Sequence, residues 1–370
     1  MPSADPFPVR VDSSACRTAF GDARATCAAL LAGRRALQPH PIAGPDGGDA
    51  VPLAPMPGRS LEETAPPGWL PAVDELAAEI PAEGWGSPRR PVFVTSSNFG
   101  VGSLHAFQRT GAPEHLAYGT PFACVDFLRV RFGWGANVAV LSHACVSAHL
   151  GLVLASRTLH AGLADRALVF SFDFLSPFVT GGFGALKILN AGFPAPYAVR
   201  DTGSIGLGDG LAFAVLARDQ GEFTLAAHSL HNEMHHLTAN EPGGAGFSAC
   251  LGPVAAAAAG LRLWVKGHGT GTLEAGRLEA EAVARFFPGA PLVSWKGSLG
   301  HTLGSCGLVE LVLAIESLRD GRTPGTVGSA APFFTETVAA EAFANGGYDG
   351  AVLASNAFGG AHAACLLHHA

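Results

Sequence analysis

The feature that most constrains the fold of this chain is a strand–helix–strand pattern that occurs twice. In the first copy, apolar runs at 138–141 and 167–172 flank residues 145–160, where leucine and valine recur at helical spacing. In the second copy, apolar segments at 261–272 and 291–297 flank a helical pattern at residues 279–287. Because two buried strands joined by a helix pair in parallel through a crossover, the pattern predicts an α/β fold.

The two copies divide the chain into two similar halves, which we expect at residues 1–215 and 216–370. No polar linker separates them, which favours two layers that share one core over independent domains. A first helix is expected at 20–37. The Pro- and Gly-rich stretch at 39–81 is expected to be an inserted loop with one short helix at 72–80. The other elements indicated by the pattern are a strand at 91–97, a helix at 304–319 and a closing hairpin at 348–369.

Composition places the chain among compact, weakly charged proteins. Of its 370 residues, 48% are apolar and 14% are charged, which excludes general disorder. Lys and Arg total 23 against 30 Asp and Glu, a net charge of −7, so no chain-wide basic field favours duplex DNA or an anionic membrane. We therefore expect neither a nucleic-acid nor a membrane partner.

The cysteines and the N-terminal residues bear on location. Seven cysteines are widely spaced and none forms a C-x-x-C pair, which predicts reduced thiols in a cytoplasmic protein. The first residues lack the cationic and apolar regions of a signal peptide, and the most apolar later run, 254–263, is too short to cross a bilayer.

Cys145 lies between a predicted buried strand and the first turn of a predicted helix. Backbone amides and the positive end of the helix dipole favour a thiolate at such a position, so Cys145 is a candidate nucleophile. The alternative is a small buried residue at a strand–helix junction, and position alone leaves both interpretations open.

Three further candidates also follow predicted strands. His268 stands among glycines in VKGHGTGT, which clear space for a ligand or another backbone but lack the last glycine of a dinucleotide loop. Lys296 and His301 stand five residues apart in SWKGSLGHTLGSCG, and a lysine beside an apolar strand is costly unless it is paired or functional. Each histidine alone could be structural. Because open α/β sheets gather ligands at the carboxyl ends of their strands, we expect these residues to converge with Cys145.

A rival cluster is His231, Glu233 and His235 in the segment HNEMHH. The zinc-protease helix requires glutamate directly after its first histidine, whereas Asn232 occupies that place. We therefore expect no metal site.

Four segments together resemble the β-ketoacyl synthases, the condensing enzymes of the thiolase superfamily that act in fatty-acid and polyketide synthesis. They are HACVSAHLGLVLA with Cys145, GHGTGTLEAGRLEAEA with His268 and Glu279, KGSLGHTLGSCG with Lys296 and His301, and SNAFGGAHA with Phe358, Gly359 and Gly360. Weaker likeness extends through nearly the whole chain.

The resemblance implies a thiolase-like fold, in which two stacked βαβαβαββ halves make a five-layer α-β-α-β-α body that is usually dimeric. It implies that Cys145 takes an acyl group from a carrier-protein thioester. His268 and His301 would bind the thioester carbonyl of a malonyl-type extender while it loses CO₂, and the enolate would attack the acyl-Cys145 carbonyl. No cofactor is implied.

The resemblance also implies roles for the other motif residues. Lys296, paired with Glu279, would fix charge and orientation near the histidines. The backbone N–H groups of Cys145 and Phe358 would form an oxyanion hole, and Phe358 would gate the acyl pocket. The other residues expected at the substrate are Gly359, Gly360, Thr270 and Thr272.

Departures from the family's usual pattern leave the reacting groups in place. Ser-His-Ala precedes Cys145 where the family often has Asp-Thr-Ala, and Ala275-Gly276 replaces a usual Gly-Asp pair. Gly-Ala-His-Ala at 360–363 replaces Gly-Thr-Asn-Ala, and the chain is tens of residues shorter than a typical member. These changes favour a specialised polyketide or polyene pathway over bulk fatty-acid synthesis.

Three other functions stay open: a non-elongating, chain-length-factor-like subunit of a heterodimer, a cysteine acyltransferase that does not decarboxylate, and a silent carrier-protein-binding scaffold. The intact Cys145 argues against the first, because such subunits usually lose the cysteine. The expected partners are acyl- and malonyl-loaded acyl carrier protein and either a second copy or another ketosynthase-like chain. The candidates for a basic docking patch are Arg34, Arg35, Arg89, Arg90, Arg129 and Arg131.

Overall fold

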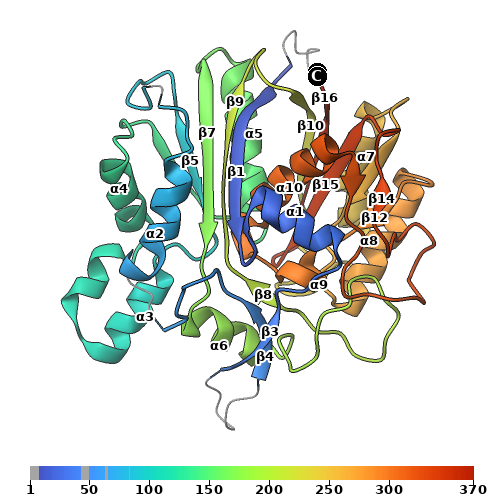
Figure 1. Ribbon diagram of the computed structural model, residues 1–370, viewed down its shortest axis with the longest axis horizontal. Helices are drawn as coiled ribbons and strands as arrows, with labels where there is room; N and C mark the ends of the chain where they lie inside the picture. The colour runs from blue at the N-terminus through green and yellow to red at the C-terminus, as the bar shows by residue number, and fades with distance from the viewer. Residues whose placement is uncertain (1–7, 43–49, 63–65, 83) are drawn as a thin grey trace.

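The computed structural model describes residues 8–42, 50–62, 66–82 and 84–370. Within these ranges, a mixed 11-stranded sheet runs in the order β12-β11-β15-β16-β10-β1-β9-β7-β5-β6, with β2 (Gly21–Asp22) paired to β1 (Figure 1). One part contains β1 (Arg10–Thr18), β5 (Val92–Thr95), β6 (Val138–Leu141), β7 (Arg166–Asp173) and β9 (Gly210–Ala217). The other contains β10 (Phe223–Asn232), β11 (Leu263–Lys266), β12 (Leu292–Val293), β15 (Gly350–Ala357) and β16 (Ala361–His369).

The two parts of the sheet repeat one topology. From β1 to β6 the successive pairings are antiparallel, antiparallel, parallel and parallel. From β10 to β12 the same four pairings recur in the same order. Only two residue pairs, Arg10–Thr224 and Val11–Phe223, join β1 to β10. We propose that the halves of the chain meet at residues 218–222, between β9 and β10, slightly beyond the boundary expected at 215.

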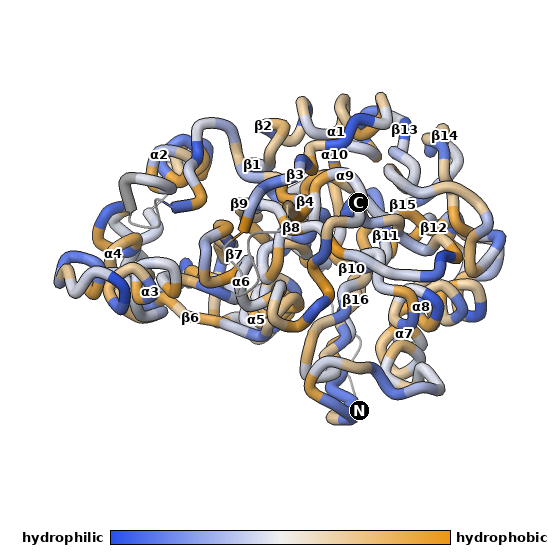
Figure 2. The backbone as a smooth tube through the Cα atoms, turned by 90° about the horizontal axis from the view of Figure 1, so that it is seen from below, coloured by the Kyte–Doolittle hydropathy of each residue, from blue (hydrophilic) through white to orange (hydrophobic). Residues whose placement is uncertain are grey.

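Helices cover the sheet in layers. The helices of the described residues are α1 (Ala23–Leu31), α2 (Pro66–Ala77), α3 (Val101–Thr110), η1 (Pro113–Tyr118), α4 (Pro121–Arg131), α5 (Ser147–His160), α6 (Pro177–Ala185), α7 (Ala245–Ala257), α8 (Leu273–Phe286), α9 (Lys296–Leu299), η2 (Leu303–Ser305) and α10 (Cys306–Asp320). Both α5 and α10 contact strands of both parts, whereas α2 and α4 contact the first part and α7 contacts the second. Figures 1 and 2 place α2 and α4 at one end of the molecule and α7 and α8 at the other. This arrangement is the five-layer, thiolase-like α-β-α-β-α fold.

The burial of the central helices explains their composition. In α10, every residue except Glu316, Arg319 and Asp320 is buried, because the helix packs on β9, β1 and β15 and against α5. Helices that are apolar on all sides belong in such a position. By contrast, the outer helix α8 has an exposed face with an Arg277–Glu281 ion pair one turn apart.

Several expected elements differ from the structure in their limits. The first helix is shorter than expected, because the Asp22 side chain caps its start and Gly33 (φ 65°) ends it. The stretch expected to be loop contains β3 (Gln38–Pro41) and β4 (Ala50–Ala54), which pair with each other and with β8 (Leu207–Gly208). The short helix expected at 72–80 is α2, and α8 begins six residues before the expected 279. Parts of this stretch, 43–49 and 63–65, lie outside the described residues.

Other expectations agree with the structure. The central strand–helix–strand unit is β6-α5-β7, with β5 paired in parallel between its strands. The second unit is β11-α8-β12, and the closing hairpin is β15-β16. Strand β10 and helix α7 were not expected, and a short two-stranded sheet joins β13 (Arg322–Thr323) to β14 (Phe343–Ala344). None of the helices in the described ranges has the length and apolar character needed to cross a membrane.

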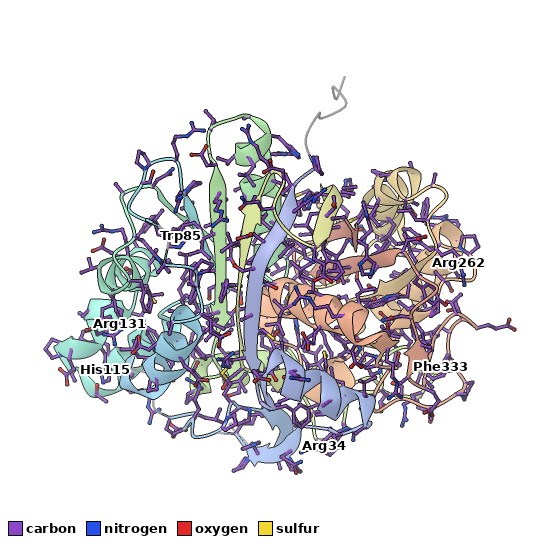
Figure 3. All side chains as sticks on the ribbon, turned by 45° about the horizontal axis from the view of Figure 1, so that its top comes forward. Arg34, Trp85, His115, Arg131, Arg262 and Phe333 are labelled. Carbon is purple, nitrogen blue, oxygen red and sulfur yellow. The ribbon has the colours of Figure 1, made fainter. Side chains whose placement is uncertain are left out.

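The six candidate docking arginines do not form one basic patch. Three are each paired with an aspartate: Arg89 with Asp165, Arg129 with Asp126 and Arg131 with Asp74. Arg35 donates to backbone oxygens of Gly297 and Gly328. Figure 3 shows Arg34 and Arg131 on separate parts of the molecule. Which of these candidate arginines a carrier protein would contact therefore stays a prediction.

Candidate active site

Cys145 lies in a tight turn between β6 and α5. The preceding residue, Ala144, has a left-handed backbone (φ 45°), which is unusual for a residue with a side chain. Ser147 holds the turn: its hydroxyl accepts from the His143 N–H at 2.7 Å and donates to the Ala144 carbonyl at 2.7 Å. The turn directs a cysteine that is only 8% exposed into a pocket.

The two histidines converge on Cys145. His301 Nε2 lies 3.0 Å from Cys145 Sγ, within hydrogen-bond distance. The rings of His268 and His301 meet edge to face, with centroids 4.9 Å apart and an interplanar angle of 86°. Residues separated by more than 150 positions in the chain thus share one small site.

Backbone contacts hold His301 in place. Its N–H donates to the Gly206 carbonyl at 2.7 Å, and its carbonyl accepts from the Gly208 N–H at 3.1 Å. Gly300, with φ 73°, makes the turn that brings the chain from α9 to this bridge. The segment before β9 therefore positions a residue of the second half.

Glu279 holds the His268 loop. Its carboxylate accepts from the N–H of His268 at 2.5 Å, the N–H of Gly269 at 2.9 Å and the hydroxyl of Tyr197 at 2.7 Å. The expected ion pair between Glu279 and Lys296 is wrong. Helix α8 presents the Glu279 carboxylate to backbone amides. The carboxylate therefore orients the His268 loop and does not pair with the ammonium group of Lys296.

The glycines around His268 allow other parts of the protein to approach closely. A Cβ at Gly267 would lie 2.2 Å from the Tyr197 hydroxyl oxygen, and one at Gly269 would lie 2.6 Å from Ser294 Cβ. The glycines could make room for a ligand or for other parts of the protein. At Gly267 and Gly269 the space is filled by the protein itself.

The partner of Lys296 is Glu310, on the buried helix α10. Lys296 Nζ lies 2.6 Å from one carboxylate oxygen of Glu310, and Lys266 Nζ contacts the other oxygen. All three side chains are at most 7% exposed. Sequence reasoning missed Glu310 and Lys266. The available signals were an acidic residue within the apolar helix pattern CGLVELVLAI and a lysine that ends the apolar strand LWVK.

Burial dominates the electrostatics of the site. It raises the pKa of the Cys145 thiol, and Cys306 acts in the same direction, while Lys296 and a hydrogen bond from the Phe358 N–H act in the opposite direction. Burial also lowers the pKa of His268 and of His301, assisted by the positive charge of Lys296. Burial thus opposes the effect that the helix N-terminus is expected to have on the Cys145 thiol. Both directions favour the neutral forms, a thiol beside imidazoles, in the resting site.

Phe358 contacts the same sulfur from the β15-β16 turn. Its N–H is a hydrogen-bond donor to Cys145, and its ring stacks on Phe183 with centroids 5.9 Å apart. Phe358 lines the pocket, whereas Gly359 and Gly360 form the adjacent turn at φ 83° and 74° and do not line it. Phe358 is therefore part of the site, whereas Gly359 and Gly360 lie next to it in the turn, outside the pocket wall.

The pocket has a volume of about 310 Å³. Cys145, His268 and His301 lie in its wall together with Thr270 and Thr272, whose hydroxyls are 3.2 Å apart. Its apolar wall contains Phe183, Ile188, Ile205 and Leu273. A pocket with an apolar wall and a few convergent polar groups is typical of a small-molecule site.

Sequence comparison agrees with this geometry. Residues 223–329 match a family model described as beta-ketoacyl synthase, C-terminal domain. The chain is 26% identical over 260 residues to 3-oxoacyl-[acyl-carrier-protein] synthase 2 of Coxiella burnetii, covering 60% of this chain and 63% of that protein. It is 28% identical over 227 residues to the chloroplastic 3-oxoacyl-[acyl-carrier-protein] synthase II of Arabidopsis thaliana, covering 54% and 42%. In sequence, the chain is therefore similar to the β-ketoacyl synthases.

Solved structures share the fold of this protein over nearly the full chain. A beta-ketoacyl synthase from Burkholderia phymatum superposes with a TM-score of 0.83 at 20% identity, over 98% of this chain and 100% of that chain. A ketosynthase in complex with its chain length factor from Xenorhabdus doucetiae gives 0.80 at 21% identity, over 100% of both chains. The chain matches less than two thirds of the length of the two curated relatives, so its activity and substrates are taken up as proposals.

Ligand geometry bears on whether zinc could occupy this site. The donor atoms of Cys145, His268 and His301 all lie within 4.8 Å of one another. Two ligands of one tetrahedral zinc, at usual Zn–S and Zn–N lengths, stand about 3.6 Å apart. The 3.0 Å separation of Sγ and Nε2 is shorter, and fits a hydrogen bond between thiol and imidazole.

Proposed function

We propose that this chain is a β-ketoacyl-acyl-carrier-protein synthase that joins an acyl group held on Cys145 to a malonyl-type extender with loss of CO₂. The observation that carries the proposal is the 3.0 Å contact between Cys145 Sγ and His301 Nε2, with the His268 ring 4.9 Å from that of His301. We further propose that it serves a specialised polyketide, polyene or fatty-acid-like pathway.

The first step is transfer of an acyl group to Cys145. As the sulfur attacks the thioester carbonyl, His301 Nε2 takes the thiol proton, and the carrier thiolate leaves and receives a proton. The starting thiol and imidazole are both neutral, so no charge separation is stored in the buried resting site. The N–H of Phe358, aimed at this sulfur, is placed to stabilise the oxyanion that forms on the acyl carbonyl.

The second step is decarboxylation of the extender. The bond from its α-carbon to the carboxylate breaks, CO₂ leaves, and the electron pair moves to the thioester oxygen as an enolate. N–H groups of His268 and His301 stabilise that oxygen, each by roughly 3 to 4 kcal/mol if well aligned. The enolate carbon then attacks the acyl-Cys145 carbonyl and the carbon–sulfur bond breaks. The sulfur leaves as a thiolate and takes up one proton from solvent to return to its thiol form.

The remaining motif residues support these steps. Glu279 orients the His268 loop through two backbone amides, and Lys296 places a positive charge near the enolate. Thr270 and Thr272 line the pocket and are placed to contact the thioester-bearing part of the substrate. Phe358, stacked on Phe183 at the apolar wall, is placed to gate the acyl pocket.

Acyl carrier protein and a second ketosynthase-like chain are the proposed partners. A ketosynthase bound to an acyl carrier protein shares this fold (TM-score 0.80, 15% identity), and so does the ishigamide ketosynthase/chain length factor (0.77, 18%). These neighbours support a heterodimer, with a homodimer as the alternative. We also propose a cytoplasmic location, in keeping with the reduced cysteines.

Acyl loading tests the nucleophile. Incubation with an acyl-loaded carrier protein should add one acyl group to the wild type and to Cys124→Ala, and none to Cys145→Ala, by intact-mass analysis. Cys124 is a matched control because it is also a buried, free cysteine. An unmodified wild type would contradict the nucleophile and favour a non-elongating subunit.

Release of CO₂ separates condensation from simple acyl transfer. His268→Ala should lower CO₂ release from malonyl-loaded carrier protein by at least roughly 100-fold, because an oxyanion donor is lost, and should leave acyl loading intact. His301→Ala should lower both, since this nitrogen contacts the sulfur. Acyl loading without any CO₂ release by the wild type would favour the acyltransferase alternative.

A further inference from the structure

One buried carboxylate binds two ammonium groups beneath the site. Glu310 contacts Lys296 through one oxygen and Lys266 through the other. Lys266 is 0% exposed, Lys296 2% and Glu310 5%. The three side chains therefore hold a net charge of +1 in the interior of the protein.

An excess buried charge of this kind lowers the stability of the folded protein, so it calls for a functional explanation. A buried lysine paired with a buried glutamate would already be neutral, and a second ammonium group must be desolvated without a carboxylate of its own. The groups that act on Lys266 are Glu310 and Cys306 on α10 and Lys296 on α9. Its strand neighbours, Val293 on β12 and Leu353 on β15, are apolar.

The excess charge acts electrostatically on the histidines of the site. Positive charge on Lys266 and Lys296 disfavours protonation of both His268 and His301. It acts in the same way on His149, which lies one turn beyond Cys145 on α5. Lys296 favours the charged form of the Cys145 sulfur. Negative charge that develops on an enolate oxygen between the two histidines would be stabilised by both ammonium groups.

We propose that Lys266 is a positioning residue that maintains an excess positive charge beneath the cysteine and the two histidines and thereby raises the reactivity of Cys145. It acts through Glu310 and through the electric field, and does not touch the substrate. The inference rests on the proposed function for the role of Cys145, but its test requires no carrier protein.

Alkylation of Cys145 by iodoacetamide measures this effect directly. At pH 7 the rate follows the fraction of thiolate, so Lys266→Met should lower it roughly tenfold, the change that a rise of one unit in the pKa of the Cys145 thiol would produce. Lys266→Arg keeps the charge and should stay within about threefold of the wild type. Peptide mass spectrometry assigns the modification to Cys145, with Cys145→Ala as the blank.

Stability distinguishes this role from a structural one. Lys266→Met leaves Glu310 paired with Lys296, so its free energy of unfolding should equal or exceed that of the wild type. A structural lysine would show the reverse: lower stability and an unchanged alkylation rate. A rate in Lys266→Met within twofold of the wild type would overturn the proposal.

The wild type supplies a second measurement should Lys266→Met fail to fold. Burial lowers the pKa of Lys266 to about 8, so the excess charge is lost in mildly alkaline solution. The logarithm of the alkylation rate should rise with unit slope below pH 8 and less steeply above it. Lys266→Arg should keep unit slope to pH 9, because arginine stays protonated. Identical slopes in the two proteins would also overturn the proposal.

Discussion

His149 shows what complete burial does to a single titratable residue. It is 2% exposed, and its ring packs against Gly307 of α10. Among the described residues no hydrogen-bond partner reaches its Nε2. Burial, reinforced by His228, Lys266 and Lys296, lowers its pKa to about 3. His149 is therefore neutral in the folded protein over the whole physiological range.

This shift makes stability depend on pH. Below its ordinary pKa of about 6.5, the unfolded chain binds a proton at His149 that the folded protein does not. The contribution is therefore fully present above pH 6.5 and is lost as the pH falls toward 3. Between pH 7.5 and 5.5, His149→Leu should lose about 1 kcal/mol less unfolding free energy than the wild type, measured by urea denaturation.

The comparison between two pH values controls for other effects of the substitution. A general loss of packing in His149→Leu lowers stability equally at both pH values and cancels. Asp173, whose pKa burial raises to about 6, changes stability in the opposite sense in both proteins and cancels as well. An equal pH dependence in the two proteins would contradict a neutral His149.

At the scale of elements, Asp173 ties three segments together beside Cys145. At the end of β7, its carboxylate accepts from Ser96 Oγ at 2.8 Å, the Asn98 N–H at 2.9 Å and the Ser305 N–H at 3.1 Å. Ser96 and Asn98 belong to the segment that follows β5, and Ser305 belongs to η2. Gly304 fits into this junction, and a Cβ there would lie 2.6 Å from Ser97 N and 3.1 Å from the Ala144 carbonyl oxygen.

Gly304→Ala should therefore disturb both stability and the site. We expect a loss of about 2 kcal/mol in unfolding free energy and slower alkylation of Cys145, because the added methyl group displaces the Ala144 turn. Gly182→Ala is the matched control, since no atom lies within 4 Å of its Cβ position and it sits inside α6. That change should be neutral or stabilising by about 0.5 to 1 kcal/mol. Equal behaviour of the two variants would refute the close packing.

At the scale of the whole molecule, one core joins the two halves. A buried cluster includes Phe93 of β5, Leu152 of α5, Leu311 of α10 and Leu353 of β15. Because α5 and α10 pack against both parts of the sheet, neither half can unfold without exposing the apolar surface of the other.

Unfolding should therefore be a single transition. Trp85 and Trp134 are buried in the first half, while Trp264 and Trp295 are buried in the second. In a Trp264→Phe, Trp295→Phe double variant, fluorescence reports the first half, and it should change at the same urea concentration as far-ultraviolet circular dichroism. Separate midpoints would show that the halves are independent domains.

Much of the fold was predictable, because buried strands and amphipathic helices have local signatures. The strand at 138–141 and the closing hairpin agree with β6, β15 and β16. The two strands at 38–41 and 50–54 were not predictable from local sequence, because both contain proline and glycines lie between them. They form because β3 pairs with β4 and β4 pairs with β8, which is more than 150 residues away in the chain.

Sequence alone determined the repeated α/β pattern and indicated the residues that we propose carry the chemistry, because hydrophobic period and motif spacing are properties of neighbours along the chain. Only the tertiary structure decided how buried charges are shared. Glu279 and Glu310 lie 17 and 14 residues from Lys296, so spacing does not distinguish them. Helix α8 turns Glu279 toward the His268 amides, while α10, packed between the halves, brings Glu310 to two lysines. The protonation state of Cys145 was decided there too, because it depends on the burial created by both halves together.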